Sequence, residues 1–194
     1  MRAIVLCGGR GSRLGGRIEK PLREVGDVPM IERVLSGLSE SAAVDSVFAA
    51  VTPQAPATAE WARDAESLRV VETPGEGYVD DLNSALDAVG TPAVTVAADL
   101  PLLAGEHVDR AVAATRQEEG PGGRASVTVL TPARLKRRLD VSVDEGDTDW
   151  LPTGLNVVGD TDSIVDVRTW DARLAVNVNY ERDLAAAEAL LVEG

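Results

Sequence analysis

The stretch LCGGRGSRLGGRIEKPL, residues 6–22, joins a short apolar run to a loop that is rich in glycine and carries Arg13 and Lys20. Glycine leaves the backbone free to turn and lets amide N–H groups approach phosphate oxygens. The two cationic side chains can neutralise the charge of a triphosphate. The pattern predicts an anion-binding loop suited to a triphosphate and formed by Gly8, Gly9, Gly11, Gly15 and Gly16, although a glycine-rich turn alone could be merely a flexible loop.

Two common phosphate-binding motifs do not fit this loop. A P-loop requires a Lys-Ser or Lys-Thr pair directly after its second glycine, whereas Gly16 is followed by Arg17 and Ile18. A dinucleotide fingerprint requires glycines at relative positions one, three and six, and counting from Gly9 the sixth position is Leu14. The spacing excludes both motifs.

On both sides of the loop, short β-branched runs alternate with amphipathic stretches. Runs of Val, Ile and Ala predict strands, and apolar residues at helical spacing predict helices. Strands are expected at residues 2–7, 46–51, 69–72, 93–98, 126–130, 155–158 and 174–178, and helices at residues 30–38, 58–65 (with Thr58 as the N-cap), 78–89, 108–115 and 182–192. This alternation favours a Rossmann-like, three-layer α/β/α fold with a mostly parallel sheet.

The length of 194 residues favours a single domain, residues 1–194, because two ordinary cores would need a longer chain. No apolar run is long enough to insert into a membrane, and the N-terminus does not resemble a signal peptide, so a cytoplasmic protein is expected. Cys7 is the single cysteine, which excludes an intramolecular disulfide, and His107 is expected to be a solvated helix residue. The sequence leaves the oligomeric state open, a homodimer included.

The charge balance is strongly acidic, with a formal net charge of −13. Such a surface repels polyanions, so no nucleic-acid partner is expected. The 19 cationic residues comprise 17 Arg and only two Lys, Lys20 and Lys136. An acidic chain poor in lysine is typical of proteins from a salt-loving microbe such as a halophilic archaeon, although a high-GC genome alone could produce the same composition.

A candidate metal ligand follows the expected strand at residues 93–98. Asp99 precedes Leu100 and Pro101 and lies where the carboxyl ends of strands in an open α/β sheet meet the ligand. A carboxylate at this position can hold Mg²⁺ against a triphosphate. The alternative is an Asp-Leu-Pro turn that only ends the strand.

The glycine loop resembles the signature of nucleotidyltransferases with a GT-A-like fold, which include the molybdenum-cofactor guanylyltransferases and the sugar-phosphate nucleotidyltransferases. That signature, L-x-G-G-x-G-x-R-x-G followed by E-K-P-L, is present here from Leu6 to Leu22. The resemblance implies that triphosphate is bound by the loop, with Arg13, Lys20 and Asp99 as the catalytic residues. Further loop contacts to the nucleotide are implied for Leu6, Cys7, Gly8, Gly9, Gly11 and Ser12.

Three later segments resemble the archaeal GTP:adenosylcobinamide-phosphate guanylyltransferases: GEGYVDDLN (residues 75–83), LPTGLNVV (151–158) and NVN (177–179), the last followed by Asp183 and Leu184. The resemblance implies transfer of GMP from GTP to adenosylcobinamide phosphate, with Mg²⁺ as the cofactor. It also implies nucleotide contacts from Gly75, Gly77, Asp81 and Asn83, and a second metal or phosphate contact from Asn177. Asp81 and Asn83 could equally form the polar face of a helix.

Some alternatives remain open at this point. A molybdenum-cofactor or sugar-phosphate nucleotidyltransferase would share the glycine loop, and a non-catalytic nucleotide-sensing domain would share part of it. Two D-x-D pairs, at residues 147–149 and 160–162, have a form used by glycosyltransferases, but chance pairs are expected among 17 aspartates. The basic run at residues 134–138 could contact an anion, although its helix-like spacing favours a solvated face.

Overall fold

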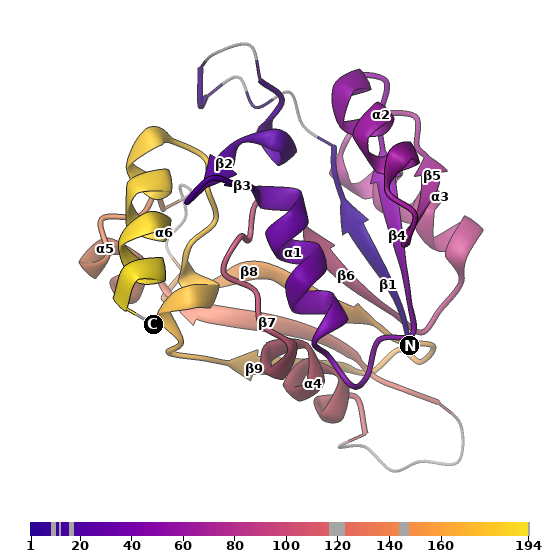
Figure 1. Cartoon of the computed structure of the whole chain (residues 1–194). Helices are drawn as coiled ribbons and strands as arrows, with labels where there is room; N and C mark the ends of the chain where they lie inside the picture. The colour runs from indigo at the N-terminus through magenta and orange to yellow at the C-terminus, as the bar shows by residue number, and fades with distance from the viewer. Residues whose placement is uncertain (9–10, 12, 16–17, 117–122, 144–147, 194) are drawn as a thin grey trace.

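The computed structural model describes residues 1–8, 11, 13–15, 18–116, 123–143 and 148–193. Within these residues the chain forms a seven-stranded sheet (Figure 1). The strand order is β5 (Leu68–Glu72), β4 (Ser46–Val51), β1 (Arg2–Leu6), β6 (Ala93–Ala97), β8 (Trp150–Val158), β7 (Ser126–Pro132) and β9 (Ile164–Arg168). Only β8 runs antiparallel to its described neighbours, so the prediction of a mostly parallel α/β sheet is confirmed.

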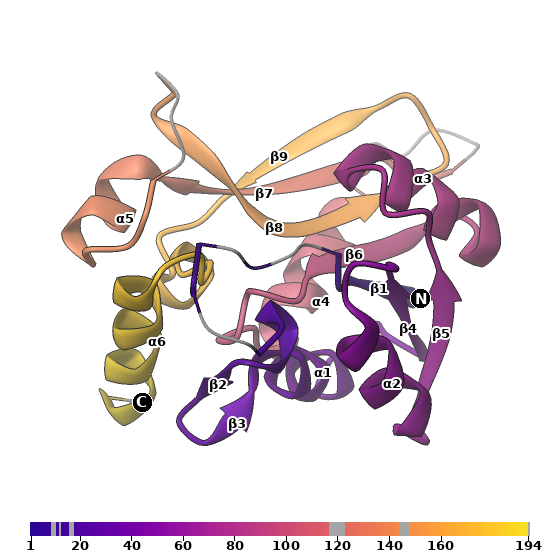
Figure 2. The ribbon, with the colours of Figure 1, turned by 90° about the horizontal axis from the view of Figure 1, so that it is seen from above.

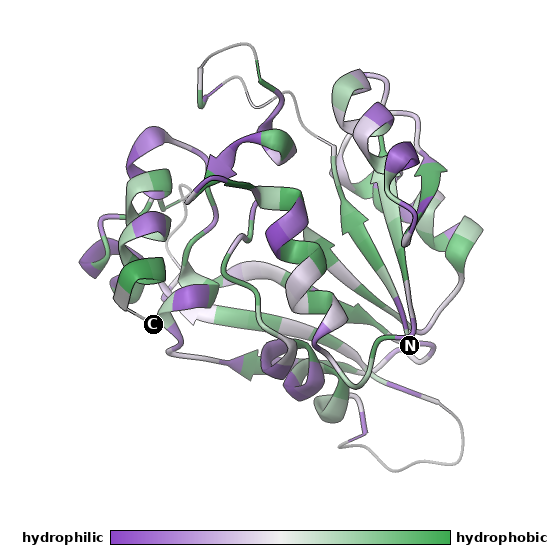
Figure 3. Ribbon diagram, viewed as in Figure 1, coloured by the Kyte–Doolittle hydropathy of each residue, from purple (hydrophilic) through white to green (hydrophobic). Residues whose placement is uncertain are grey.

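Helices cover the two faces of the parallel half of the sheet. One face packs against α1 (Met30–Ser39), α2 (Pro56–Asp64) and α4 (Gly105–Ala114), whereas the other packs against α3 (Tyr78–Val89). Figure 2 shows α3 on the opposite side of β1 and β4 from α1 and α2. Burial on both faces explains why these strands are continuous apolar runs, as the green strands in Figure 3 show.

The last third of the described chain contributes to a second apolar cluster beside the first. Helix α6 (Glu181–Glu193) packs on the two-stranded sheet that is formed by β2 (Glu24–Val25) and β3 (Val28–Pro29). It also packs on the residues that come before α6 in the chain, which include Val176 and Val178. The short α5 (Ala133–Arg138) follows β7, and two 3₁₀ turns, η1 (Lys20–Leu22) and η2 (Ala172–Ala175), complete the elements. None of the described helices is long and apolar enough to cross a membrane.

The structure corrects three local predictions. The expected strand at residues 174–178 is wrong, because η2 occupies its first half and the remainder runs beside Asp99 without joining the sheet. Strand β9 was not predicted, because Asp166 and Arg168 interrupt its apolar residues, of which Val165 and Val167 are only partly buried and Ile164 is exposed. Thr58 is not an N-cap, since α2 begins two residues earlier, at Pro56, after Ala55.

Candidate active site

A cleft of about 580 Å³ opens where the carboxyl ends of β1, β6 and β7 meet the amino end of β8. This is the position at which open α/β sheets bind their ligands. The cleft brings together residues from positions 6 to 179, which include five of the predicted site residues: Leu6, Gly8, Lys20, Asp99 and Asn177. It also contains five polar residues that the sequence did not single out as site residues: Tyr78, Thr128, Lys136, Asn156 and Asn179.

Lys20 and Asp99 form an ion pair at the centre of the cleft. The Lys20 Nζ donates to Asp99 Oδ2 at 2.5 Å and to Asn179 Oδ1 at 2.7 Å. The side chains of Lys20 and Asp99 are 16% and 18% exposed, so both can still reach a ligand in the cleft. The ammonium group thus occupies a position between a carboxylate and an amide oxygen, which are ligand atoms that Mg²⁺ also accepts.

Asn177 lies on the other side of Asp99. Its Nδ2 donates to Asp99 Oδ1 at 3.2 Å and to the Thr153 carbonyl at 2.8 Å, while its Oδ1 accepts from Lys136 Nζ at 3.0 Å. In this arrangement the oxygen of Asn177 faces an ammonium group and not the carboxylate. To ligate a metal together with Asp99, Asn177 would have to turn its amide group. Asn179 would not, because its Oδ1 already faces the Lys20 ammonium that Asp99 also binds.

The two asparagines are positioned by the backbone between them. Val178 N–H donates to the Asp99 carbonyl at 2.9 Å, which fixes the segment against the end of β6. Because side chains alternate along an extended chain, Asn177 and Asn179 can both be directed to the Asp99 carboxylate. The segment positions both asparagines without belonging to the sheet. Its alternating pattern therefore led to the wrong prediction of a strand at residues 174–178.

Two carboxylates, one partly buried and one fully buried, hold the flanking segments in place. Glu19 accepts from the backbone N–H groups of Ala57 and Thr58 at 3.0 and 2.7 Å, and thereby anchors the glycine loop to the positive end of α2. Asp183 is fully buried and accepts from the N–H groups of Asn179 and Tyr180, each at 2.8 Å. These contacts explain the Glu of the EKPL segment and the Asp that follows NVN.

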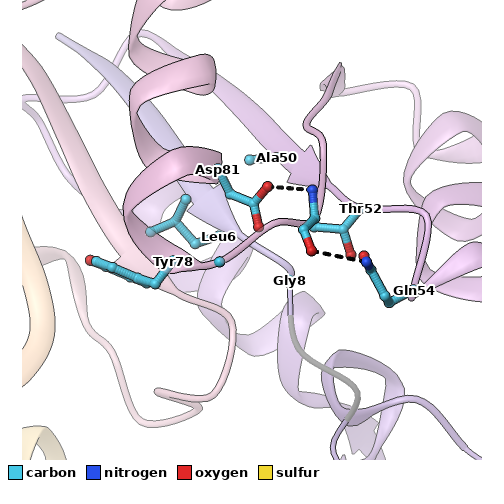
Figure 4. Close-up of a pocket in the computed structure, with 9 residues that line it drawn as sticks. Leu6, Gly8, Ala50, Thr52, Gln54, Tyr78 and Asp81 are labelled. Carbon is cyan, nitrogen blue, oxygen red and sulfur yellow. Dashed lines mark hydrogen bonds between the residues drawn. The ribbon is translucent and has the colours of Figure 1, made fainter.

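A second cavity, of about 290 Å³, adjoins the cleft on the side of β1 and β4 (Figure 4). Among the predicted nucleotide contacts, Leu6, Gly8, Gly75, Gly77 and Asp81 line it. Asp81 is 8% exposed, and its Oδ1 accepts from the Gly75 N–H at 2.6 Å, while Gln54 Nε2 donates to the Gly75 carbonyl at 2.9 Å. Gly75 is thus held from both sides, at a positive φ of 75°.

Tyr78 borders both cavities, at the first turn of α3. Burial raises the pKa of its hydroxyl, and the negative charge of Asp99 adds to the effect. The hydroxyl therefore stays protonated at neutral pH and is a hydrogen-bond donor at the passage between the two cavities.

Other predicted nucleotide contacts are not placed in these cavities. Asn83 is exposed on α3 and lines neither of them, and Arg13 is exposed beyond the cleft. Gly9 and Ser12 lie outside the described residues. The side chain of Cys7 is fully buried in the main core, where burial raises the pKa of its thiol to about 12, so a thiolate nucleophile is not available there.

The prediction that His107 is a solvated helix residue is wrong. His107 is not solvated: it is 4% exposed, its Nδ1 accepts from Ala104 N–H at 3.0 Å, and its Nε2 lies 2.9 Å from Asp171 Oδ2. Arg173 also binds Asp171, and this hydrogen bond is the main reason why the pKa of Asp171 lies below its usual range. The cluster joins η2 to α4 through ion pairs.

The basic run at residues 134–138 is only partly a solvated face. Arg134, Arg137 and Arg138 are exposed, but Lys136 is 5% exposed and lines the cleft. The D-x-D pair at residues 160–162 lies on a turn, where Asp160 accepts from Arg124 N–H, and it lines neither cavity. Of the other pair, Asp147 lies outside the described residues.

The Lys–Asp pair at the carboxyl ends of the strands fits a nucleotidyltransferase, and this is the class to which the relatives of the chain belong. The chain belongs to the family of MobA-like NTP transferase domains, whose profile matches residues 3–151. It is 30% identical, over 98% of its length, to the adenosylcobinamide-phosphate guanylyltransferase of Methanocaldococcus jannaschii, 97% of which is covered.

Solved structures show the same fold at low sequence identity. The 4-diphosphocytidyl-2C-methyl-D-erythritol synthase of Anaerococcus prevotii superimposes with a TM-score of 0.71 at 14% identity, covering 98% of this chain and 97% of that one. A UDP-glucose pyrophosphorylase from Acinetobacter baumanii superimposes with a TM-score of 0.67 at 12% identity, covering 96% and 91%. The predicted GT-A-like nucleotidyltransferase fold is confirmed.

Proposed function

We propose that this nucleotidyltransferase transfers GMP from GTP to adenosylcobinamide phosphate, giving adenosylcobinamide-GDP and pyrophosphate. The observation that carries the proposal is the similarity to the Methanocaldococcus jannaschii guanylyltransferase, which extends beyond the glycine loop to the NVN segment. That segment supplies both asparagines beside Asp99. A relationship limited to nucleotide binding would not require it.

The base of GTP would occupy the side cavity between β1 and α3. Guanine presents two adjacent donors, N1–H and the 2-amino group, whereas adenine presents an acceptor at N1. A buried carboxylate accepts from guanine and repels adenine, so Asp81 is the residue that we assign to the choice of base. Its Oδ1 bond to Gly75 fixes the direction of the carboxylate.

The triphosphate would lie along the glycine loop, with Arg13 and Lys20 compensating its charge. An oxygen of the acceptor phosphate attacks the α-phosphorus in line, a new P–O bond forms, and the bond to the β-phosphate oxygen breaks to release pyrophosphate. The acceptor phosphate is already ionised near neutral pH, so no general base is required. The residues act mainly by positioning the two anions and compensating their charge.

The donor atoms around Asp99 fit a divalent cation. Asp99 and Asn179 already share one positive charge, that of Lys20, through two oxygen atoms. We assign Asp99 as the principal Mg²⁺ ligand, with Asn179 or a turned Asn177 as the second. Bound Mg²⁺ would compensate the charge that develops on the triphosphate. Lys20 would then move from Asp99 to the phosphates.

Pyrophosphate release measured with each triphosphate and each acceptor tests the proposal. GTP with adenosylcobinamide phosphate should give turnover, while ATP, CTP and UTP should give much less. Molybdopterin and glucose 1-phosphate serve as competing acceptors. Turnover with either of these, and none with adenosylcobinamide phosphate, would refute the acceptor assignment and leave the nucleotidyltransferase class intact.

A further inference from the structure

Both lysines of this chain are in the cleft, although 17 of its 19 cationic residues are arginines. Lys20 contacts Asp99, and Lys136 contacts Asn177, on the far side of the same carboxylate. On the six-residue α5, Lys136 is 5% exposed, whereas the arginines at 134, 137 and 138 are exposed. An ammonium group is a compact point charge that suits a phosphate, so the two lysines mark two positions for phosphate.

We propose that Lys136 binds the phosphate of the acceptor and holds it for attack on the α-phosphorus, while Lys20 binds the triphosphate of GTP. This inference rests on the proposed function, because it presumes an acceptor that carries a phosphate group. It assigns to Lys136 a direct contact with substrate.

The strand order separates the two lysines. Lys20 follows β1, Asp99 follows β6, and Lys136 follows β7, with β8 between β6 and β7. The base cavity lies entirely on the β1 and β4 side, where Leu6, Ala50 and Thr52 line it. A nucleotide with its base there extends its phosphates towards Asp99. The acceptor must then approach from the β7 and β8 side, which Lys136 borders.

The part of the cleft next to Lys136 is suited to a large acceptor. Thr128, Leu151 and Pro152 line it, and no described helix covers this face of β7 and β8 in Figure 2. Asn177 bridges Lys136 to Asp99 through one amide, at 3.0 and 3.2 Å. The bridge links the Lys136 ammonium to the Asp99 carboxylate, so a phosphate bound by Lys136 would lie near the proposed metal ligand.

The alternative is that Lys136 only fastens α5 to the NVN segment. Lys136→Met keeps the length of the side chain and removes its charge, and Lys136→Arg keeps the charge. Arg138→Ala is the matched control, because Arg138 is exposed on the same helix and lines neither cavity. All variants are compared by thermal unfolding, by calorimetry with GTP and by steady-state kinetics with adenosylcobinamide phosphate.

We expect Lys136→Met to bind GTP within about twofold of wild type and to lower kcat/KM for the acceptor by roughly 10–100-fold, the loss of one charge-assisted contact. Lys136→Arg should recover part of this loss, and Arg138→Ala should match wild type. A loss of GTP affinity as large as the loss in acceptor kinetics would place Lys136 with the triphosphate. An unchanged kcat/KM for the acceptor would mean that Lys136 has only a structural role. Either result overturns the proposal.

A measurement independent of turnover separates this inference from the proposed function. Protein labelled with ¹³C at lysine Cε has two side-chain signals, assigned with Lys136→Arg. GTP should shift the Lys20 signal, and adenosylcobinamide phosphate or inorganic phosphate added to the GTP complex should shift the Lys136 signal. If wild type does not turn over adenosylcobinamide phosphate but inorganic phosphate shifts Lys136, only the acceptor identity fails. If neither phosphate shifts Lys136 in the GTP complex, the inference about Lys136 fails.

Discussion

Gly11 lies so close to Lys20 that a Cβ atom at position 11 would come within 2.7 Å of the Lys20 Cβ. Gly11 also has a φ of +58°, which a side chain disfavours. Gly11 therefore packs directly against the lysine that pairs with Asp99, and glycine at position 11 is required for both reasons.

The first prediction uses a matched pair of glycines. Gly11→Ala and Gly15→Ala both place a side chain at positive φ, but a Cβ at Gly15, where φ is +65°, meets no atom of the described residues within 4 Å. Both variants should lose about 1–2 kcal/mol of conformational free energy. Only Gly11→Ala displaces Lys20, so it should weaken GTP binding at least tenfold more than Gly15→Ala in calorimetry. Equal losses in the two variants would mean that the contact with Lys20 is unimportant.

The second prediction separates metal binding from triphosphate binding. Asp99→Asn keeps the shape of the side chain, removes the charge that would hold Mg²⁺, and releases Lys20 from its ion pair. We expect it to lose most pyrophosphate release but to bind GTP without Mg²⁺ as well as wild type or better. Lys20→Ala and Arg13→Ala should weaken metal-free GTP binding by roughly 1.5–3 kcal/mol each. Normal turnover of Asp99→Asn with Mg²⁺ would place the metal elsewhere.

The third prediction concerns the choice of base. Asp81→Asn can still accept from the Gly75 N–H through its amide oxygen, but it loses the carboxylate that we assign to guanine. The ratio of GTP to ATP affinity should fall by at least tenfold. Asp80→Asn is the control, because Asp80 is the exposed neighbour on the same helix. An unchanged ratio in Asp81→Asn would show that other groups read the base.

The fourth prediction follows from the net charge of −13. Screening weakens repulsion among exposed carboxylates, so the melting temperature should rise as KCl increases from about 0.1 M towards molar concentration. We expect one cooperative transition, in line with a single domain over residues 1–194. A melting temperature that stays constant or falls would remove the argument for a salt-adapted protein.

The fifth prediction concerns the buried Cys7 thiol. Its pKa is raised from 9.0 to about 12 in the folded chain, so between these values the unfolded state loses a proton that the folded state keeps. The unfolding free energy of wild type should therefore fall, relative to Cys7→Ala, by about 1.4 kcal/mol for each pH unit above 9. Urea unfolding from pH 8 to pH 10.5 measures this difference. A pH-independent difference would mean that the thiol is not protected by burial.

Much of the fold could be predicted, because it depends on local patterns. Continuous apolar runs predicted β1, β4, β5 and β6, and the order of Gly, Arg and Lys after the first strand predicted a triphosphate loop, of which Gly8 and Lys20 line the cleft. The antiparallel direction of β8 could not be predicted, because periodicity carries no information on strand order or direction.

The half of the cleft that we propose for the acceptor was hidden by the shortness of its elements. With six residues, α5 shows less than two turns, and a basic run suggests solvent unless the burial of its neighbours is known. One signal was present: Ala133 and Lys136 are three residues apart, so they share a helix face, and both are buried in the structure. His107 was misjudged because its partner, Asp171, is 64 residues away.

The dependence of Asn179 on Asp183 has a consequence for the order in which the protein matures during synthesis. A nascent chain that has emerged as far as residue 116 already contains β1, β4, β5 and β6, the whole lining of the base cavity, and both Lys20 and Asp99. Lys136, Asn177 and Asn179 emerge later, and Asn179 is held only after Asp183 has followed. An unfinished chain thus contains every residue that lines the proposed base cavity long before it contains the residues that we assign to the acceptor and to the second metal contact.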